Sequence, residues 1–476
     1  MIFKQFYLPV LSHASYFIGD EGSRMALVVD PQRDITQYVE EAKKYKLRIV
    51  NVFLTHFHAD FVAGHLELHQ QTEAQICLGA QAQAGYPFQA FPDGKSLTYG
   101  DLRVQVLETP GHTPESISLL VFDLHQSSDR PYAILTGDAL LNGDVGRPDL
   151  LEFQGYNSRT LAENLYDSLH EKILPLPDDT LVYPTHGPGT FCAKIRHHEL
   201  FSTLGVQKHT NPALQPMEKE SFCDRLTTNQ PDPPSYFRYD AAVNARNRSC
   251  LDKVINNALN PLPLDQVLRW KTSRANLLDI RDAEEFAKEH MLDCLNIGLN
   301  GKFEFWVGTL LHPESPIVLI AEPGQARQAV LRLARIGFDH VVGYLKGGAL
   351  ALAATPELIH SVQHMTVEDL DAHLLSENPP YIVDVRSKEE WEERRIDHSH
   401  NIPLNHLQDR LQEIPTDREV VVHCSDGYRS SIAVSLLHRH DVCHVRHVLG
   451  GFEAWEHMVM NSSGTLADVS RQIGGR

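Results

Sequence analysis

Histidine and aspartate recur in the N-terminal half of the chain at one kind of place, directly after an apolar, strand-like run. Four runs end in this way, and the residues that follow them are His56, His58 and Asp60 after V-N-V-F-L-T, then His112, Asp138 and His186 after the three later runs. Loops at strand ends can project several side chains toward one point, and imidazoles with carboxylates are typical ligands of transition metals. A single histidine of this kind is best explained as a hydrogen-bonded loop residue. Four strand ends together favour a metal site.

A cysteine in the C-terminal half lies between a strand-like run and a helical stretch. The run E-V-V-V-H ends at Cys424, and the loop C-S-D-G-Y-R closes with Arg429. Backbone N–H groups and the helix dipole at such a position favour the thiolate, and Arg429 adds a positive charge. The pattern predicts a reactive thiol at Cys424.

The elements that must position these residues fall into three predicted domains. A length of 476 residues implies about three domains at roughly 100 to 200 residues each. The segment N-L-L-D-I-R-D-A-E-E-F at 276–286 recurs as Y-I-V-D-V-R-S-K-E-E-W at 381–391, and both copies alternate short strands with helices. We therefore expect parallel α/β units in the C-terminal half. The predicted domains are residues 1–245, 246–360 and 361–476.

The first copy of the repeat lacks the reactive pair of the second. Aligning the two copies places Ala321 where the second has Cys424 and Ala326 where it has Arg429. Cys294 cannot replace the missing thiol, because it lies in D-C-L-N-I before a strand and not in the loop. We predict that the first copy is catalytically silent and spaces or docks the other domains.

Composition excludes several classes of protein. With 42% hydrophobic and 22% charged residues, the chain has the balance of a globular protein. The 43 basic and 62 acidic residues give a net charge of −19, which opposes binding to nucleic acids or anionic membranes. Seven widely spaced cysteines without a C-x-x-C pair argue against a disulfide scaffold. No long apolar run or leader pattern is present, so we expect a cytoplasmic protein.

The order of the N-terminal motifs resembles the metallo-β-lactamase superfamily. The loop T-H-F-H-A-D-F follows that superfamily's H-x-H-x-D-H pattern, and His112, Asp138 and His186 follow in the same order. The resemblance implies an αββα sandwich, so the expected fold is a multidomain α/β protein with this sandwich before two α/β repeats. One departure is Phe61, which replaces the last histidine of the loop and argues against a two-zinc hydrolase of the glyoxalase II kind.

Within that superfamily the loop, P-G-H-T-P-E-S at 110–116 and T-G-D-A-L-L-N-G-D-V-G-R-P-D-L at 136–150 most closely resemble the persulfide dioxygenases. The resemblance implies one Fe(II) per chain, bound by His56, His112 and Asp138. Two histidines and one carboxylate occupy one side of the ion and leave coordination positions open for a persulfide sulfur and O2. Zinc in the same site would be redox-silent.

The same resemblance implies roles around the metal. His58, Asp60 and His186 would orient ligands or relay protons, with a purely structural hydrogen-bond role as the equal alternative. Arg147 would bind a substrate carboxylate, or else only pair with Asp149 at the surface. Cys192, in H-G-P-G-T-F-C, is either a small buried thiol or a sulfur carrier or substrate contact.

The C-terminal repeats resemble rhodanese sulfurtransferases. The C-x4-R loop and the D-V-R and G-G-F-E-A-W flanks carry this resemblance, and a phosphatase loop would be one residue longer. The resemblance implies that Cys424 and Arg429 are catalytic in the last domain.

Together the resemblances imply oxidation of a small persulfide, glutathione persulfide by default, with O2 to sulfite and thiol. Cys424 would then interconvert persulfide plus sulfite and thiosulfate, in a direction that the sequence leaves open. Coenzyme A, bacillithiol and cysteine persulfides stay open as substrates, and the resemblance implies self-association. Two alternatives remain, a two-metal thioester hydrolase fused to a sulfurtransferase and a sulfur carrier with a vestigial metal domain.

Overall fold

The computed structural model describes residues 1–193, 199–228, 230, 232–442, 444–462 and 473–474. Cys443 and most of the 460–476 tail therefore lie outside the described residues. The chain divides into two compact units, Met1–Val254 with Leu333–Phe338, and Ile255–Arg332 with Asp339–Arg476. No helix among the described residues is long and apolar enough to cross a lipid bilayer.

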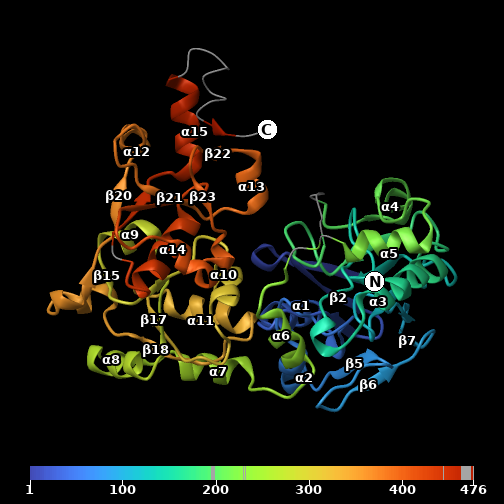
Figure 1. Ribbon diagram of the computed structural model, residues 1–476. Helices are drawn as coiled ribbons and strands as arrows, with labels where there is room; N and C mark the ends of the chain where they lie inside the picture. The colour runs from blue at the N-terminus through green and yellow to red at the C-terminus, as the bar shows by residue number, and fades with distance from the viewer. Residues whose placement is uncertain (194–198, 229, 231, 443, 463–472, 475–476) are drawn as a thin grey trace. The chain divides into compact units, whose positions relative to one another are not determined.

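The first unit is built on two six-stranded sheets (Figure 1). The first sheet has the order β1-β2-β3-β4-β5-β6, and its strands are β1 (Ile2–Leu8), β2 (His13–Asp20), β3 (Met25–Val29), β4 (Arg48–Phe53), β5 (Gln75–Gly79) and β6 (Gln89–Phe91). The second has the order β12-β11-β10-β9-β8-β7, and its strands are β7 (Ser96–Tyr99), β8 (Leu102–Glu108), β9 (Ile117–Asp123), β10 (Ala133–Gly137), β11 (Leu181–Pro184) and β12 (Ser202–Thr203).

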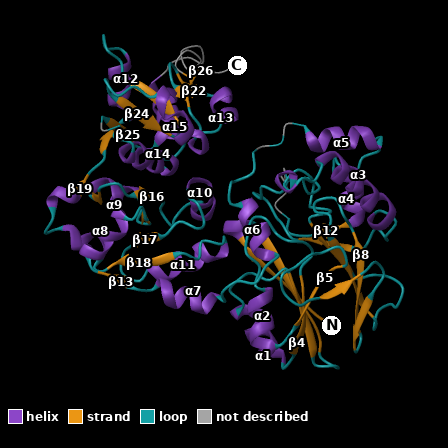
Figure 2. Ribbon diagram, turned by 60° about the horizontal axis from the view of Figure 1, so that its bottom comes forward, coloured by secondary structure: helices purple, strands orange, loops and turns teal. Residues whose placement is uncertain are grey.

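The two sheets of the first unit pack face to face between helices. Their shared core holds Val29 and Phe53 from the first sheet against Val104 and Leu135 from the second. Helices lie on the outer sides (Figure 2), and they are α1 (Thr36–Tyr45) and α2 (His65–Thr72) beside the first sheet, and α3 (Ser158–Ser168), α4 (Leu204–Thr210) and α5 (Lys219–Thr227) beside the second. The unit also contains α6 (Phe237–Asn244). The boundary between the units falls within α7 (Leu251–Ala258). The predicted αββα sandwich is confirmed.

The burial of the strands explains this layering. In β8 the side chains of Leu102, Val104 and Val106 are buried and alternate with half-exposed ones, as in a strand with one face on the core. All residues of β10 are buried, because the other sheet covers one face and α3 covers the other.

The second unit contains two five-stranded parallel sheets with the same strand order. The first repeat has the order β13-β18-β17-β14-β16, formed by β13 (Pro261–Leu262), β14 (Asn276–Asp279), β16 (Leu295–Asn296), β17 (Ile317–Ile320) and β18 (Val341–Leu345). The second has the order β20-β25-β24-β21-β23, formed by β20 (Gln363–Met365), β21 (Tyr381–Asp384), β23 (His400–Asn401), β24 (Val420–His423) and β25 (Val445–Val448). The predicted parallel α/β repeats are confirmed.

Helices and two short ribbons complete the second unit. The helices are α8 (Leu264–Thr272), α9 (Ala283–Lys288), α10 (Phe303–Leu310) and α11 (Ala326–Arg335) in the first repeat, and α12 (Val367–Leu374), α13 (Lys388–Glu393), α14 (Tyr428–Arg439) and α15 (Gly451–Ser462) in the second. The ribbons pair β15 (His290–Met291) with β19 (Ile359–His360) and β22 (Arg395–Ile396) with β26 (Ile473–Gly474). Helices on both faces explain why strands such as β17 and β24 are buried along their whole length.

Candidate functional site

Three predicted ligands meet at one edge of the first unit. His56 follows β4, His112 follows β8 and Asp138 follows β10 directly. All three are buried, and their ligand atoms lie within 4.8 Å of one another. Strands from both sheets end at this edge, so the sandwich brings together residues that lie far apart in the sequence. The predicted convergence of strand ends is confirmed.

Hydrogen bonds fix which ring nitrogen of each histidine is available to a metal. Nδ1 of His112 donates to the Arg147 carbonyl at 2.8 Å, which leaves the lone pair on Nε2, 3.6 Å from Asp138 Oδ2. The Thr55 hydroxyl donates to Asp30 at 2.9 Å and therefore accepts from Nδ1 of His56 at 3.0 Å. Each imidazole then presents Nε2, as metal-bound histidines held by a hydrogen bond on the other nitrogen do. Two imidazoles and one carboxylate fit Fe(II).

His186 lies between two carboxylates beside this group. Its Nδ1 is 2.8 Å from both carboxylate oxygens of Asp138, and its Nε2 is 2.8 Å from Asp60 Oδ2. Burial alone would lower the pKa of His186, but Asp138 and Asp60 raise that pKa well above its ordinary value. Burial would raise the pKa of Asp138, but the charge and hydrogen bond of His186 hold it below the ordinary value. Asp138 is therefore kept ionised and oriented.

His58 belongs to a hydrogen-bond network that the sequence analysis missed. Its Nε2 lies 3.0 Å from Asp30 Oδ1, and Asp30 also accepts from the Thr55 backbone N–H at 2.7 Å and the Thr185 hydroxyl at 2.8 Å. Asp30 is fully buried, so these donors satisfy a charge that burial would otherwise disfavour. The signal was present, because Asp30 directly follows the apolar strand β3, by the same rule that identified the other residues.

Phe61 occupies the space where the superfamily pattern has a histidine. Its ring is stacked on His58 at a centroid distance of 4.4 Å and lies 3.8 Å from the ring of His13. Both ring nitrogens of His13, another residue absent from the sequence prediction, are buried without a hydrogen-bond partner. The apolar ring of Phe61 offers no ligand, so the second metal position of a two-zinc site loses an imidazole here.

Cys192 is buried beside Asp60 and His186. One ligand atom from each of these three residues lies within 4.8 Å of the others. Burial raises the pKa of the Cys192 thiol to about 12. The structure thus brings Cys192 to the predicted centre as a thiol that burial keeps protonated near pH 7.

The Arg147 side chain forms an ion pair with Asp149, two residues further along the chain. Its guanidinium donates to Asp149 through Nε at 2.7 Å and a second nitrogen at 2.5 Å, and its side chain is only 3% exposed. The pair with Asp149 is therefore present, but it joins a buried arginine to a half-buried aspartate and does not lie fully on the surface. The backbone of Arg147 connects the centre, since its carbonyl accepts from His112 and its N–H donates to the Cys192 carbonyl at 3.0 Å.

Cys424 lies, as predicted, between β24 and the start of α14. Its Sγ accepts from the Gly427 backbone N–H at 3.1 Å and is 3.4 Å from the Ser430 hydroxyl. Gly427 has a φ of 111°, a left-handed conformation that favours glycine and aims its N–H at the sulfur. In the first repeat Ala321 follows β17 and Ala326 begins α11, so the loop is present there without the thiol.

Arg429 forms an ion pair with Glu390. It donates to both oxygens of Glu390 at 2.7 and 2.8 Å and to the Ser425 hydroxyl at 2.8 Å. Burial would raise the pKa of Glu390, but Arg429 and the other donors lower it to about 2. The expected positive charge is therefore largely compensated by Glu390, and the ion pair fixes the shape of the loop.

The first repeat contacts the Cys424 loop directly. The Tyr428 hydroxyl donates to the Gly298 carbonyl at 2.7 Å, and Ser431 donates to the Asn296 side chain at 2.7 Å. A Cβ atom on Gly301 would overlap the Tyr428 ring. The first repeat thus supports the Cys424 loop of the second.

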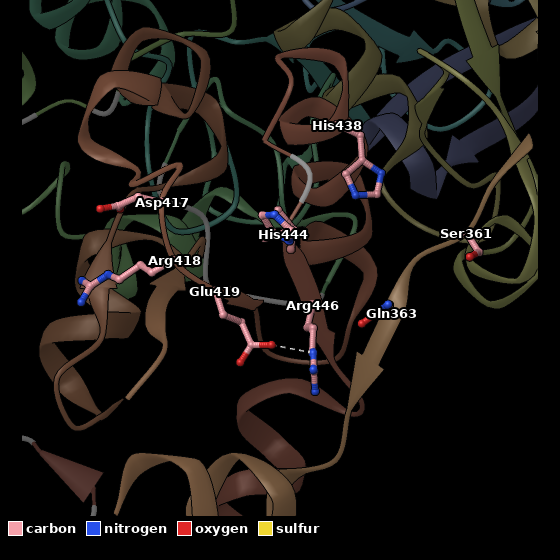
Figure 3. Close-up of a pocket in the computed structure, with 9 residues that line it drawn as sticks. Ser361, Gln363, Asp417, Arg418, Glu419, His438, His444 and Arg446 are labelled. Atoms are coloured by element: carbon pink, nitrogen blue, oxygen red, sulfur yellow. Dashed lines mark ion pairs between the residues drawn. The ribbon is translucent and has the colours of Figure 1, made fainter. Parts of the chain in front are cut away.

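A cavity of about 430 Å³ lies at the opposite end of the same strands (Figure 3). Its lining includes Arg418 and Glu419 before β24 and Arg446 in β25, and Arg446 pairs with Glu419 at 2.7 Å. Cys424 follows the carboxyl end of β24 and does not line this cavity. None of the predicted site residues belongs to it.

Comparison with known proteins agrees with this division. Residues 264–355 and 366–458 each match the family described as Rhodanese-like domain. The chain is 31% identical to "Persulfide dioxygenase ETHE1, mitochondrial" of Homo sapiens over 220 residues, which cover 45% of this chain and 76% of that protein. It is also 31% identical over 206 residues to "Probable metallo-hydrolase YqgX" of Bacillus subtilis, covering 38% of this chain and 88% of that protein.

A solved structure extends the likeness beyond the N-terminal half. A metallo-beta-lactamase from Staphylococcus aureus is 30% identical, with a TM-score of 0.64, and the match covers 72% of this chain and 98% of that one. The sandwich, the two repeats and these matches lead to one assignment. The chain belongs to the ETHE1-like persulfide dioxygenase family of the metallo-β-lactamase superfamily, joined to two rhodanese-like domains.

Proposed function

We propose that the first unit is a persulfide dioxygenase with one Fe(II) per chain and that the last domain is a sulfurtransferase. A persulfide RSSH, glutathione persulfide by default, would react with O2 and water to give RSH, sulfite and two protons. The observation that carries the proposal is the buried His56, His112 and Asp138 group beside Phe61. This arrangement supports one metal ion with open positions and removes an imidazole from a second.

The metal would supply the redox chemistry that lets O2 react with the persulfide sulfur, and the chain would supply the positioning. The Arg147 carbonyl fixes the His112 ring, and His186 holds the Asp138 carboxylate in place. The His186 ring lies between Asp138, which faces Nδ1, and Asp60, which faces Nε2, and this arrangement supports a role in orienting ligands or relaying protons.

The proposed substrate contacts follow from the same geometry. A substrate carboxylate would compete with Asp149 for the Arg147 guanidinium, because the two oxygens of Asp149 already occupy its fork. Cys192 lies close enough to Asp60 and His186 to meet a bound sulfur compound.

In the last domain Cys424 would accept sulfane sulfur. Its thiolate would attack the outer sulfur of RSSH, release RS⁻ and become a persulfide, which sulfite would then take up as thiosulfate. The reverse flow uses the same steps. The Gly427 N–H and the Ser430 hydroxyl beside Sγ support this role, since both can donate to a charged sulfur.

Oxygen uptake with defined metal loading tests the proposal. The full-length protein is stripped of metal, loaded with Fe(II) or Zn(II), and mixed with glutathione persulfide in an oxygen electrode. With iron we expect uptake matched by the sum of sulfite and thiosulfate, since Cys424 would convert part of the sulfite, and we expect no uptake with zinc. Absence of uptake with iron would contradict the proposal and favour a sulfur carrier with a vestigial metal domain.

A second candidate is a two-metal thioester hydrolase. The observation in its favour is the group of Asp60, His186 and Cys192, which would have to hold the second ion. It predicts about two zinc ions per chain and hydrolysis of S-lactoylglutathione without O2. Metal analysis of the purified protein distinguishes the two candidates.

A further inference from the structure

The Ser430 hydroxyl has more neighbours than it has hydrogens. Its Oγ lies 3.4 Å from Cys424 Sγ, 3.1 Å from the Gly427 carbonyl and 2.8 Å from Nε2 of His447. A hydroxyl carries one hydrogen, so it donates to one of these atoms at a time. The Gly427 carbonyl also accepts from the Ser431 backbone N–H at 3.1 Å, and its second lone pair keeps it a possible acceptor for Ser430. Of the three neighbours, the imidazole is the one that can also donate a hydrogen to the Ser430 oxygen.

The state of His447 decides this choice. His447 lies on β25 and is 6% exposed, and burial lowers its pKa to about 4, so the ring is neutral near pH 7. A neutral ring has two tautomers. If Nε2 carries the hydrogen, it donates to Ser430, and the Ser430 hydrogen is left for the sulfur or the Gly427 carbonyl, of which a charged sulfur is the stronger acceptor. If Nε2 is bare, it accepts that hydrogen and the sulfur loses a donor.

We propose that His447 is a positioning residue of the sulfur-transfer site, which directs the Ser430 hydroxyl at Cys424 as a second donor beside the Gly427 N–H. A thiolate or persulfide anion would favour this orientation, because a hydrogen bond to a charged acceptor is stronger than one to a neutral imidazole. When Cys424 is a thiol, the other tautomer lets Ser430 turn away. The ring serves both states without becoming charged.

The other ionisable groups around these residues occupy fixed positions. The ring of His364 on β20 lies 5.6 Å from that of His447, and buried His423 ends β24. On the loop side Asp426 is 3.6 Å from Sγ, and Arg429 is paired with Glu390. Among the groups named here, His447 is the one joined to the sulfur through Ser430.

The silent repeat lacks the whole arrangement. Sheet register places Tyr344 of β18 where β25 has His447, since Leu345 and Val448 pair with corresponding residues of β13 and β20. Alignment of the two loops places Arg327 where the second repeat has Ser430. The first repeat thus has neither the sulfur nor the two residues that would orient a donor toward it.

The inference rests on the proposed sulfurtransferase, but its test does not need turnover. Full-length protein is treated with iodoacetamide between pH 5 and 10, and the alkylation rate of Cys424 is followed by mass spectrometry of its peptide. We expect Ser430→Ala and His447→Leu to raise the midpoint of this rate profile by about one pH unit, which is a tenfold loss of thiolate below the midpoint. His447→Gln, which can place a donor N–H near Nε2, should restore most of the wild-type midpoint.

The double variant and a matched control complete the test. Because His447 acts through Ser430, Ser430→Ala with His447→Leu should match Ser430→Ala alone. His400→Gln changes an exposed histidine that stacks on Tyr381, away from the loop, and should leave the midpoint unchanged.

Equal midpoints for His447→Leu and wild type, or equal shifts for His447→Leu and His447→Gln, would overturn the inference. If His447→Leu does not fold, an unshifted midpoint in Ser430→Ala would overturn it. Absence of sulfur transfer in a wild-type protein with the expected midpoints would overturn only the sulfurtransferase.

Discussion

The metal centre and the Cys424 loop use the same device, a functional group directly after a strand, but the chain builds them differently. The proposed metal ligands His56, His112 and Asp138 come from three separate loops that only the sandwich brings together. The proposed nucleophile, its N–H donor and Arg429 lie in one strand–helix junction, and only the partner of Arg429, Glu390, comes from another element, α13. A local site of this kind can be lost by a few substitutions while its scaffold remains.

The two repeats show this directly. Arg281 is paired with Asp279 and Arg386 with Asp384 through the same set of hydrogen bonds. In the first repeat Asn296 donates to the carbonyls of residues 279 and 281, and in the second Asn401 donates to those of 384 and 386. These buried hydrogen bonds are therefore shared by the two repeats, whereas the loop that holds Cys424 and Arg429 in the second has Ala321 and Ala326 in the first.

Replacing Cys424 should give the largest difference between the effects on the two activities, sulfur transfer and oxygen uptake. Cys424→Ser should lower sulfur transfer from thiosulfate by at least about a thousandfold, because no other thiol occupies a loop of this kind among the described residues. Oxygen uptake with glutathione persulfide should stay within about twofold. Cys294→Ala, which changes a buried thiol of the silent repeat, serves as the control. Thiosulfate formation at the wild-type rate in Cys424→Ser would refute the role of Cys424.

Replacing Phe61 with the histidine of the superfamily pattern tests whether Phe61 limits the predicted metal centre to one ion. Phe61→His should raise the total metal content from about one ion toward about two per chain and lower oxygen uptake by about tenfold, because a second ion would occupy space needed by the substrate. Metal analysis and the oxygen electrode measure both effects. An unchanged metal content would mean that Phe61 does not set the number of ions.

The support that the first repeat gives to the Cys424 loop predicts a smaller effect. Gly301→Val should displace the Tyr428 ring and lower sulfur transfer by about fivefold, on the scale of a 1 kcal/mol change in barrier. Tyr428→Phe, which removes only the hydrogen bond to Gly298, should have a weaker effect in the same direction. Wild-type transfer rates in both variants would show that the silent repeat does not position the loop.

The Arg429–Glu390 pair predicts the smallest effect, on stability against pH. The pKa of Glu390 is lowered to about 2 in the folded protein, so its contribution to the free energy of unfolding is present above about pH 4.5 and is lost as pH falls toward 2. Glu390→Gln should therefore lower the Tm at pH 7, and the gap to wild type should shrink at pH 3. Glu392→Gln, in an exposed pair with Lys388, is the control. A gap that is constant with pH would contradict the ion-pair role.

Much of the architecture could be predicted because its signals are local. Apolar runs ending in histidine or aspartate predicted that His56, His112 and Asp138 meet at one edge of the sandwich. The internal repeat predicted two α/β units of one topology. The position of Cys424 between β24 and α14 followed from adjacent residues in the same way.

The rest depends on contacts between distant residues. Nothing near Arg429 in the sequence indicates that Glu390 compensates its charge, and His447 contacts the Ser430 hydroxyl only because β25 lies beside β24. The burial of the Arg147 side chain also depends on the packing of the whole unit. Asp30 differs from these, since it follows a strand and was within reach of the rule applied to the other residues.

The central claim is that His56, His112 and Asp138 hold one redox-active ion, and the most direct test is oxygen uptake in a ligand variant. Iron-loaded His112→Ala is compared with wild type and with His69→Ala, which changes an exposed histidine of α2. We predict that His112→Ala loses at least about a hundredfold in glutathione persulfide-dependent uptake while His69→Ala and the sulfur transfer of all three proteins are unchanged. Wild-type oxygen uptake in His112→Ala would contradict the account.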